Sequence, residues 1–162
     1  MSINRYIPHL LILPEDDANR QIANGFLIHS NIVNTRSYVL PVAGGWNKVC
    51  ETFEKNHIDE MRRLEARHIL LLIDFDNNEN RFNEIKKLVP DDLSSRVFIL
   101  GCLSEPEALR KTMGSFENIG LELAKDCYLG VDDNWNHDLI KHNHSEMLRL
   151  GVKVKSWIFK NS

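Results

Sequence analysis

His68-Ile69-Leu70-Leu71-Leu72-Ile73, followed by Asp74-Phe75-Asp76, is the stretch that decides the fold. A strand with one solvated face would alternate apolar and polar residues, whereas this run is almost entirely aliphatic. The pattern therefore predicts a strand buried on both faces. Such strands belong mainly to parallel sheets that are covered by helices on both sides.

Shorter apolar runs on either side of this strand repeat the pattern. We expect further strands at 6–13, 37–42 and 96–102, and we consider a final strand at 152–159. Apolar residues at helical spacing predict helices between and after these strands. Two of them should begin at Asp16 or Asp17 and at Ser104. The others should span 46–64, 82–89, 115–127 and 134–150, and Gly151 should end the last.

The alternation of strands and helices predicts an α/β fold with a mostly parallel sheet of four or five strands and helices on both faces. A chain of 162 residues suits one domain. Within it we expect a Rossmann-like core at 6–110 and a helical extension at 111–162, which holds the possible last strand.

The residues that follow the expected strands are mainly acidic or glycine. If the sheet is parallel, all of these strand ends lie at one edge, where ligands of such sheets bind. The candidates at that edge are Glu15, Gly44 and Gly45, Asp74 and Asp76, and Glu105, with Lys48 shortly after the glycines.

Carboxylates crowded at one edge repel each other, and a hard divalent cation such as Mg²⁺ or Mn²⁺ relieves that repulsion. In an extended chain, Asp74 and Asp76 point to the same side, so both can address one metal while Phe75 points away. Gly44 and Gly45 lack Cβ atoms and suit a close approach of the backbone to a phosphate or a neighbouring helix.

The order of these motifs resembles the TOPRIM domain of topoisomerases, bacterial primases and small nucleases, including the OLD-family nucleases. The resemblance covers about residues 6–110. It implies that Glu15 serves in acid–base work or metal binding, and that Asp74 and Asp76 bind the metal, with Glu105 or Glu107 as a further acidic ligand. Two departures are Asp16, where the family usually has Gly, and Asn77-Asn78 after the aspartates. The resemblance implies a Mg²⁺-dependent protein that acts on phosphodiester or other phosphoryl groups, namely a nuclease.

Two other functions remain open. A TOPRIM-like fold that has lost catalysis would act as a binding or regulatory subunit. A receiver-like signalling domain would use Asp16 or Asp17, Asp74, Ser104 and Lys153, although Lys153 lies far beyond Ser104.

Several acidic residues also have a purely structural explanation. Asp16 and Asp17 suit a helix cap, and Ser104 with Glu107 suits a capping box. We interpret His137, His142 and His144 as part of a polar helix surface.

The net charge of −3 limits the kinds of partner that this chain can bind tightly. Dedicated nucleic-acid binders usually carry a basic excess, so we expect weak binding of nucleic acid by this chain alone, with a protein partner such as an ATPase. No apolar run approaches the roughly 18 residues that cross a bilayer. The three cysteines are odd in number and far apart, which favours reduced, buried thiols and a cytoplasmic location.

Overall fold

A four-stranded parallel sheet forms the centre of the computed structural model, which describes residues 3–161. The strands follow the order β2-β1-β3-β4. Their bounds are His9–Pro14 for β1, Ser37–Val39 for β2, Arg67–Leu72 for β3 and Val97–Leu100 for β4. The predicted α/β class is confirmed, and the most apolar stretch of the sequence is a central strand.

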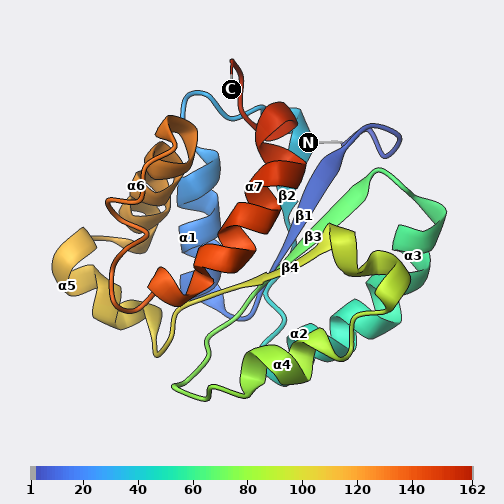
Figure 1. Ribbon diagram of the computed structural model, residues 1–162, viewed down its shortest axis with the longest axis horizontal. Helices are drawn as coiled ribbons and strands as arrows, with labels where there is room; N and C mark the ends of the chain where they lie inside the picture. Colours follow the sequence, from blue (N-terminus) through green and yellow to red (C-terminus); the bar gives the residue numbers. More distant parts are fainter. Residues whose placement is uncertain (1–2, 162) are drawn as a thin grey trace.

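Helices cover both faces of this sheet (Figure 1). One face packs against α2 (Trp46–Thr52), a π-helical turn (Phe53–His57), α3 (Ile58–Arg63) and α4 (Arg81–Lys86). The other face packs against α1 (Asp17–Leu27) and α7 (His144–Ile158). The short α5 (Arg110–Met113) and α6 (Phe116–Leu129) lie beyond α1 in Figure 1. Short 3-10 helices occupy Asn34–Arg36, Asp91–Arg96, Pro106–Leu109 and Lys141–Asn143.

Alternate residues of the central strands enter two separate cores. Leu11 and Ile69 pack toward α2 and α3, whereas Leu10 and Leu70 pack toward α1 and α7. All four side chains are buried. Two-sided burial explains why the strand sequence is continuously apolar.

Helix α6 lies against α1 at two glycines. A Cβ atom on Gly120 would lie 2.0 Å from the carbonyl oxygen of Ile22, and one on Gly25 would lie 2.0 Å from that of Glu117. Only glycine allows this backbone approach. The contact fixes α6 to α1.

The outer edge of β4 is bonded to side chains that precede or belong to α7. The backbone N–H of Ile99 donates to Glu146 over 2.9 Å, and the N–H of Gly101 donates to Asn143 over 3.2 Å. Asn143 Nδ2 returns a hydrogen bond to the carbonyl of Gly101, and Arg149 donates to the carbonyl of Val97. Backbone groups that would pair with a fifth strand are therefore occupied by α7.

The prediction of a strand at 152–159 is wrong, because this segment completes α7. Leu150, Val154 and Ile158 face the core at helical spacing, while Val152 is 85% exposed. Gly151 does not end the helix but lies inside it, and a Cβ atom there would meet nothing within 4 Å. The predicted helix at 134–150 begins only at His144, after turns and a 3-10 helix.

The helix expected from Ser104 is instead a 3-10 helix, Pro106–Leu109, followed by α5. Its N-cap is Glu105, whose side chain makes no capping hydrogen bond. The capping box that Ser104 and Glu107 suggested is therefore not at the start of this helix. Between residues 3 and 161, no helix is both long and apolar enough to span a membrane.

Candidate functional site

Glu15 and Asp74 lie side by side at the carboxyl ends of the two central strands. Pro14 pairs with Leu72 in the β1–β3 register, and the backbone N–H of Glu15 continues the ladder to the carbonyl of Leu72 over 2.9 Å. The backbone N–H of Asp74 then donates to Glu15 Oε2 over 2.6 Å. The prediction that these two residues share one edge of the sheet is confirmed.

Both carboxyl groups are withdrawn from water. Asp74 is 7% exposed and Glu15 is 9% exposed. Burial raises the pKa of Asp74 to about 8; the hydrogen bond from Asn19 lowers it, and the nearby charges of Asp16, Glu15 and Asp76 raise it further. Burial also raises the pKa of Glu15, although the hydrogen bond from the Asp74 N–H opposes this.

Asn19 connects two acidic residues of this site. Its Nδ2 donates to Asp16 Oδ1 over 3.1 Å and to Asp74 Oδ1 over 3.2 Å. Asp16 is the N-cap of α1, and the same oxygen accepts the backbone N–H of Asn19 over 3.0 Å. The first turn of α1 is therefore bonded to the end of β3.

The backbone turns sharply at the second aspartate. Asp76 and Asn77 have φ values of 48° and 57°, in the left-handed region that Asp and Asn tolerate better than most residues. The extended geometry expected through Asp76 is therefore wrong. Asp74 is buried against α1, whereas the Asp76 side chain is 54% exposed and faces α4. Phe75 is buried among the side chains that pack against α2 and α4.

Arg81, the first residue of α4, holds this turn in place. Its Nη1 donates to Asp76 Oδ2 over 2.7 Å and to the carbonyl of Asp74 over 2.8 Å. The guanidinium also lies over the Trp46 ring, 4.6 Å from the ring centroid. The Nε atom is buried and has no hydrogen-bond partner among residues 3–161. One positive charge is thus placed among several carboxylates.

Gly44 and Gly45 have positive φ values of 97° and 135°. Both backbone N–H groups donate to the carbonyl of Glu15, over 2.8 and 3.2 Å. An added Cβ atom would meet no neighbour at either glycine, so backbone conformation and not close packing explains these residues. Their loop lies beside the candidate site and fixes the backbone of Glu15.

The remaining candidates are less closely connected to the carboxylates. Lys48 is exposed and pairs with Glu51 over 3.3 Å. Glu105 is exposed at the start of a 3-10 helix, and within residues 3–161 no hydrogen bond or ion pair links it to Asp74. His142 lies edge-on against Phe75, with ring centroids 5.2 Å apart. His137 and His144 lie outside this contact, in the turn before α7 and at its first residue.

Sequence reasoning missed Asn19 and Arg81. A signal for Asn19 was present, because it lies three, four and seven residues before the apolar Ile22, Ala23 and Phe26 and therefore shares their inward face. Arg81 gave no comparable signal, since a basic residue near Asp76 is common on a solvated helix.

Across residues 3–161, no group of three or more His, Cys, Asp or Glu side chains is arranged to hold a metal ion. The acidic residues are instead connected through other groups, since Glu15 accepts the backbone N–H of Asp74, and Asp16 and Asp74 both accept from Asn19. Comparison with known proteins gave no match, either to a protein-family model, to a curated protein or to a solved structure.

Proposed function

We propose that this chain is a Mg²⁺-dependent, TOPRIM-like protein that acts on phosphodiester or other phosphoryl groups, as a nuclease. The observation that carries the proposal is the contact between Glu15 and Asp74, 2.6 Å from Oε2 to the backbone nitrogen, at the carboxyl edge of a parallel sheet. Ligands of open α/β sheets bind at this edge. The proposal is also compatible with Mn²⁺.

The chemistry of the carboxylates suits Mg²⁺. This ion binds oxygen, uses one or two protein carboxylates, and takes its other ligands from water and substrate phosphates. Glu15 and Asp74 supply such a pair, whereas Asp76 is bonded to Arg81. We assign the cation to Glu15 and Asp74, with Asp76 available if Arg81 turns toward the substrate.

Each residue then has a stated role. A bound Mg²⁺ would stabilise negative charge that develops on the phosphoryl group. Asn19 orients the Asp74 carboxylate, and Glu15, as the second ligand of the cation, would also accept a proton from the attacking water. Arg81 fixes the Asp74–Asp76 turn through its carbonyl and carboxylate contacts.

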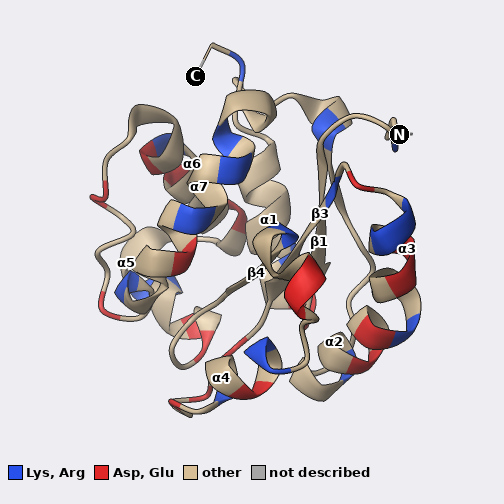
Figure 2. Ribbon diagram, turned by 45° about the vertical axis from the view of Figure 1, so that its right-hand side comes forward, with Lys and Arg blue, Asp and Glu red and all other residues tan. Residues whose placement is uncertain are grey.

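Binding of nucleic acid by this chain alone is expected to be weak at a net charge of −3. Basic segments recur along α7 in Figure 2, where Arg149, Lys153 and Lys155 follow a single acidic residue, Glu146. We therefore propose that a partner, such as an ATPase, supplies the basic surface that holds the substrate. Activity of the chain alone should fall steeply with salt.

A second candidate is a regulatory subunit without catalysis. It is favoured by the pairing of Asp76 with Arg81 and of Glu15 with a backbone N–H, because these contacts satisfy both carboxylates without a cation. The two candidates differ in their response to metal.

Thermal unfolding with and without Mg²⁺ or Mn²⁺ separates them. We expect the cation to raise the melting temperature of the wild-type protein, because it binds only the folded state. Asp74→Asn should abolish this rise. Asp59→Asn is the matched control, since it removes the same charge from an exposed side chain on α3. A wild-type melting temperature that does not respond to either cation favours the regulatory subunit.

Cleavage of DNA and RNA tests the chemistry directly. Wild-type protein with Mn²⁺ should cut, while Asp74→Asn and Glu15→Gln should each lose at least tenfold in rate. Equal rates for wild type and Asp74→Asn, measured with any partner present, would rule out the assignment of the catalytic site.

A further inference from the structure

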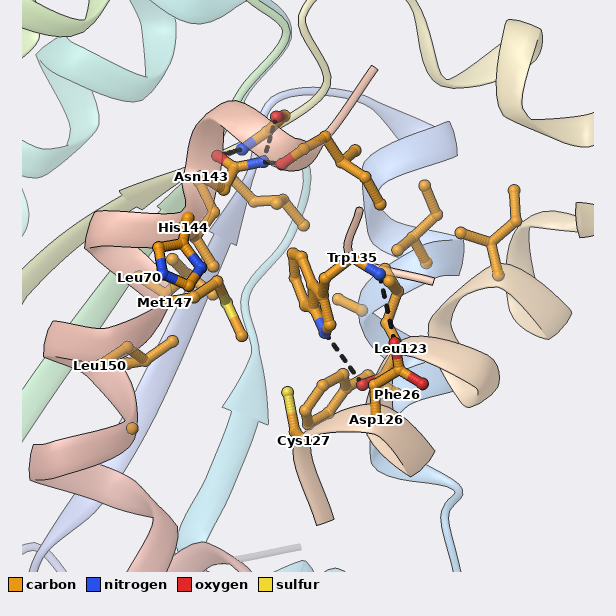
Figure 3. A pocket seen from close by; sticks show the side chains of 18 of the residues that line it. Phe26, Leu70, Leu123, Asp126, Cys127, Trp135, Asn143, His144, Met147 and Leu150 are labelled. Atoms are coloured by element: carbon orange, nitrogen blue, oxygen red, sulfur yellow. Dashed lines mark hydrogen bonds between the residues drawn. The ribbon is translucent and has the colours of Figure 1, made fainter. Parts of the chain in front are cut away.

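A cavity of about 330 Å³ lies on the sheet face opposite α2, α3 and α4. Its floor is formed by Leu10, Leu70 and Leu100, and its walls by α1, α6 and α7. Figure 3 shows Met147 and Leu150 of α7 on one side, facing Trp135, Cys127 and Phe26 across an open space. Ligand sites in proteins range from roughly 300 to 1,000 Å³, so this cavity reaches the size of a small-molecule site.

The space exists because the helices on either side of it are fixed to different partners. Helix α6 is fixed to α1 by the close contacts at Gly25 and Gly120. Helix α7 is fixed to the edge of β4 by Asn143, Glu146 and Arg149. Neither helix can move toward the other without losing these contacts. The cavity therefore follows from the way in which the two helices are anchored.

Several polar groups in the cavity wall are already bonded within the protein, and the lining residues Asp132, Asn136, Lys141 and His144 are exposed to water. Asn143 bonds to Gly101 and Ile140, and Asp126 accepts the backbone N–H groups of Asn134 and Trp135. The Trp135 indole N–H donates to the carbonyl of Leu123 over 3.2 Å. Burial raises the pKa of the Cys127 thiol to about 12, so the thiol is neutral. A charged ligand would lose its hydration without compensation from these groups.

Apolar side chains also mark an entrance. Val131 and Leu148 line the cavity, yet they are 39% and 60% exposed. Val131 follows α6, and Leu148 lies on α7. A ligand can therefore enter between these two helices, past the apolar Val131 and Leu148.

We propose that this cavity binds a neutral, mainly apolar small molecule with no more than one hydrogen-bonding group. The proposal requires no metal at the carboxylate site, and the two places share one residue, since Asn19 lines the cavity and donates to Asp74. Burial of the ligand would remove its apolar surface, and that of the cavity wall, from water.

Trp135 provides a direct test. In the protein with Trp46→Phe and Trp157→Phe, Trp135 is the only tryptophan, and its emission should change as 1-octanol is added. The melting temperature should rise over the same concentrations. Octane-1,8-diol has the same chain with a second hydroxyl group to bury, so it should bind at least tenfold more weakly.

Filling the cavity gives the matched control. Met147→Trp adds a second tryptophan, so octanol binding to this variant is followed by the rise in melting temperature. The variant should reduce octanol binding at least tenfold without lowering the melting temperature of the ligand-free protein, because the larger side chain occupies the space that Met147 faces (Figure 3). Ala23→Leu is a second filling variant from the opposite wall. Ala124→Leu, at a fully buried position outside the cavity lining, should instead lower the melting temperature.

Two results would overturn the proposal. One is an unchanged Trp135 emission and melting temperature up to the solubility limit of octanol. The other is octanol binding by folded Met147→Trp and Ala23→Leu proteins with wild-type affinity, which would place the bound molecule elsewhere.

Discussion

The Glu15 side chain accepts the backbone N–H of Asp74 over 2.6 Å, which joins the ends of β1 and β3 beyond their last regular pair. Glu15→Ala should leave this buried N–H without a partner and lower the free energy of unfolding by about 1–3 kcal/mol. Glu15→Gln keeps an acceptor oxygen and should lose less than half as much. Urea unfolding at pH 7 measures both. Since both variants remove the same charge, equal losses would show that the hydrogen bond contributes nothing.

The raised pKa of Asp74 predicts stability that falls as pH rises. Between its ordinary value of 3.8 and the folded value of about 8, the unfolded chain has lost the Asp74 proton while the folded protein keeps it. The contribution of Asp74 is thus fully present below pH 3.8 and is lost toward pH 8. Asp74→Asn should match the wild type near pH 4 and exceed its unfolding free energy near pH 8 by an amount on the order of a few kcal/mol. Urea unfolding of both proteins across this pH range, without added metal, measures the difference between their unfolding free energies. A difference that stays constant with pH would contradict the raised pKa of Asp74.

Three buried histidines predict the opposite dependence. Burial lowers the pKa of His9, His57 and His68 below 6.5. Their contribution to stability is fully present above pH 6.5 and is lost as the pH falls below it, because the unfolded chain takes up protons first. In the Asp74→Asn background, the unfolding free energy should therefore fall between pH 7 and pH 5. Replacing His57, whose Nδ1 is buried and has no partner among residues 3–161, by Leu should reduce that slope.

Two helix glycines should respond in opposite ways to the same substitution. Gly25→Ala would place a Cβ atom 2.0 Å from the Glu117 carbonyl oxygen and should cost about 1–3 kcal/mol as α6 is pushed from α1. Gly151→Ala meets nothing within 4 Å and should stabilise α7 by about 0.5–1 kcal/mol. Chemical unfolding of the two variants decides the matter. A stabilised Gly25→Ala protein would disprove the close helix contact.

The sheet could be predicted because the signal for each strand lies within a few consecutive residues. A six-residue aliphatic run has few alternatives to a buried strand, and the acidic residues after it mark its end. The shared edge of Glu15 and Asp74 then follows from parallel strand direction alone. The final segment was harder to predict, since Val152 to Phe159 suits either period. Only the packing of Val154 and Ile158 into the core on this face of the sheet favours the helix.

The details of the site depend on contacts between residues that are far apart in the sequence, and on the local turn of the backbone. Asn19 reaches Asp74 across 55 residues of sequence, and the left-handed turn at Asp76 directs the second carboxylate toward Arg81 and away from the first. An Asp-x-Asp spacing indicates a shared direction only while the backbone stays extended. Asp76 and Asn77 instead form a turn, as Asp and Asn often do, and the backbone does not stay extended.

The bonding of α7 to β4 has a consequence for how molecules of this protein meet one another. An open strand edge is a template for pairing with another chain, and such pairing leads to aggregation or exchange of segments. Asn143 and Glu146 occupy the donors at Gly101 and Ile99, and the opposite edge, β2, is only three residues long. The last helix thus shields the sheet from intermolecular growth, and a substitution that weakens Asn143 or Glu146 should promote self-association at high concentration before it abolishes folding.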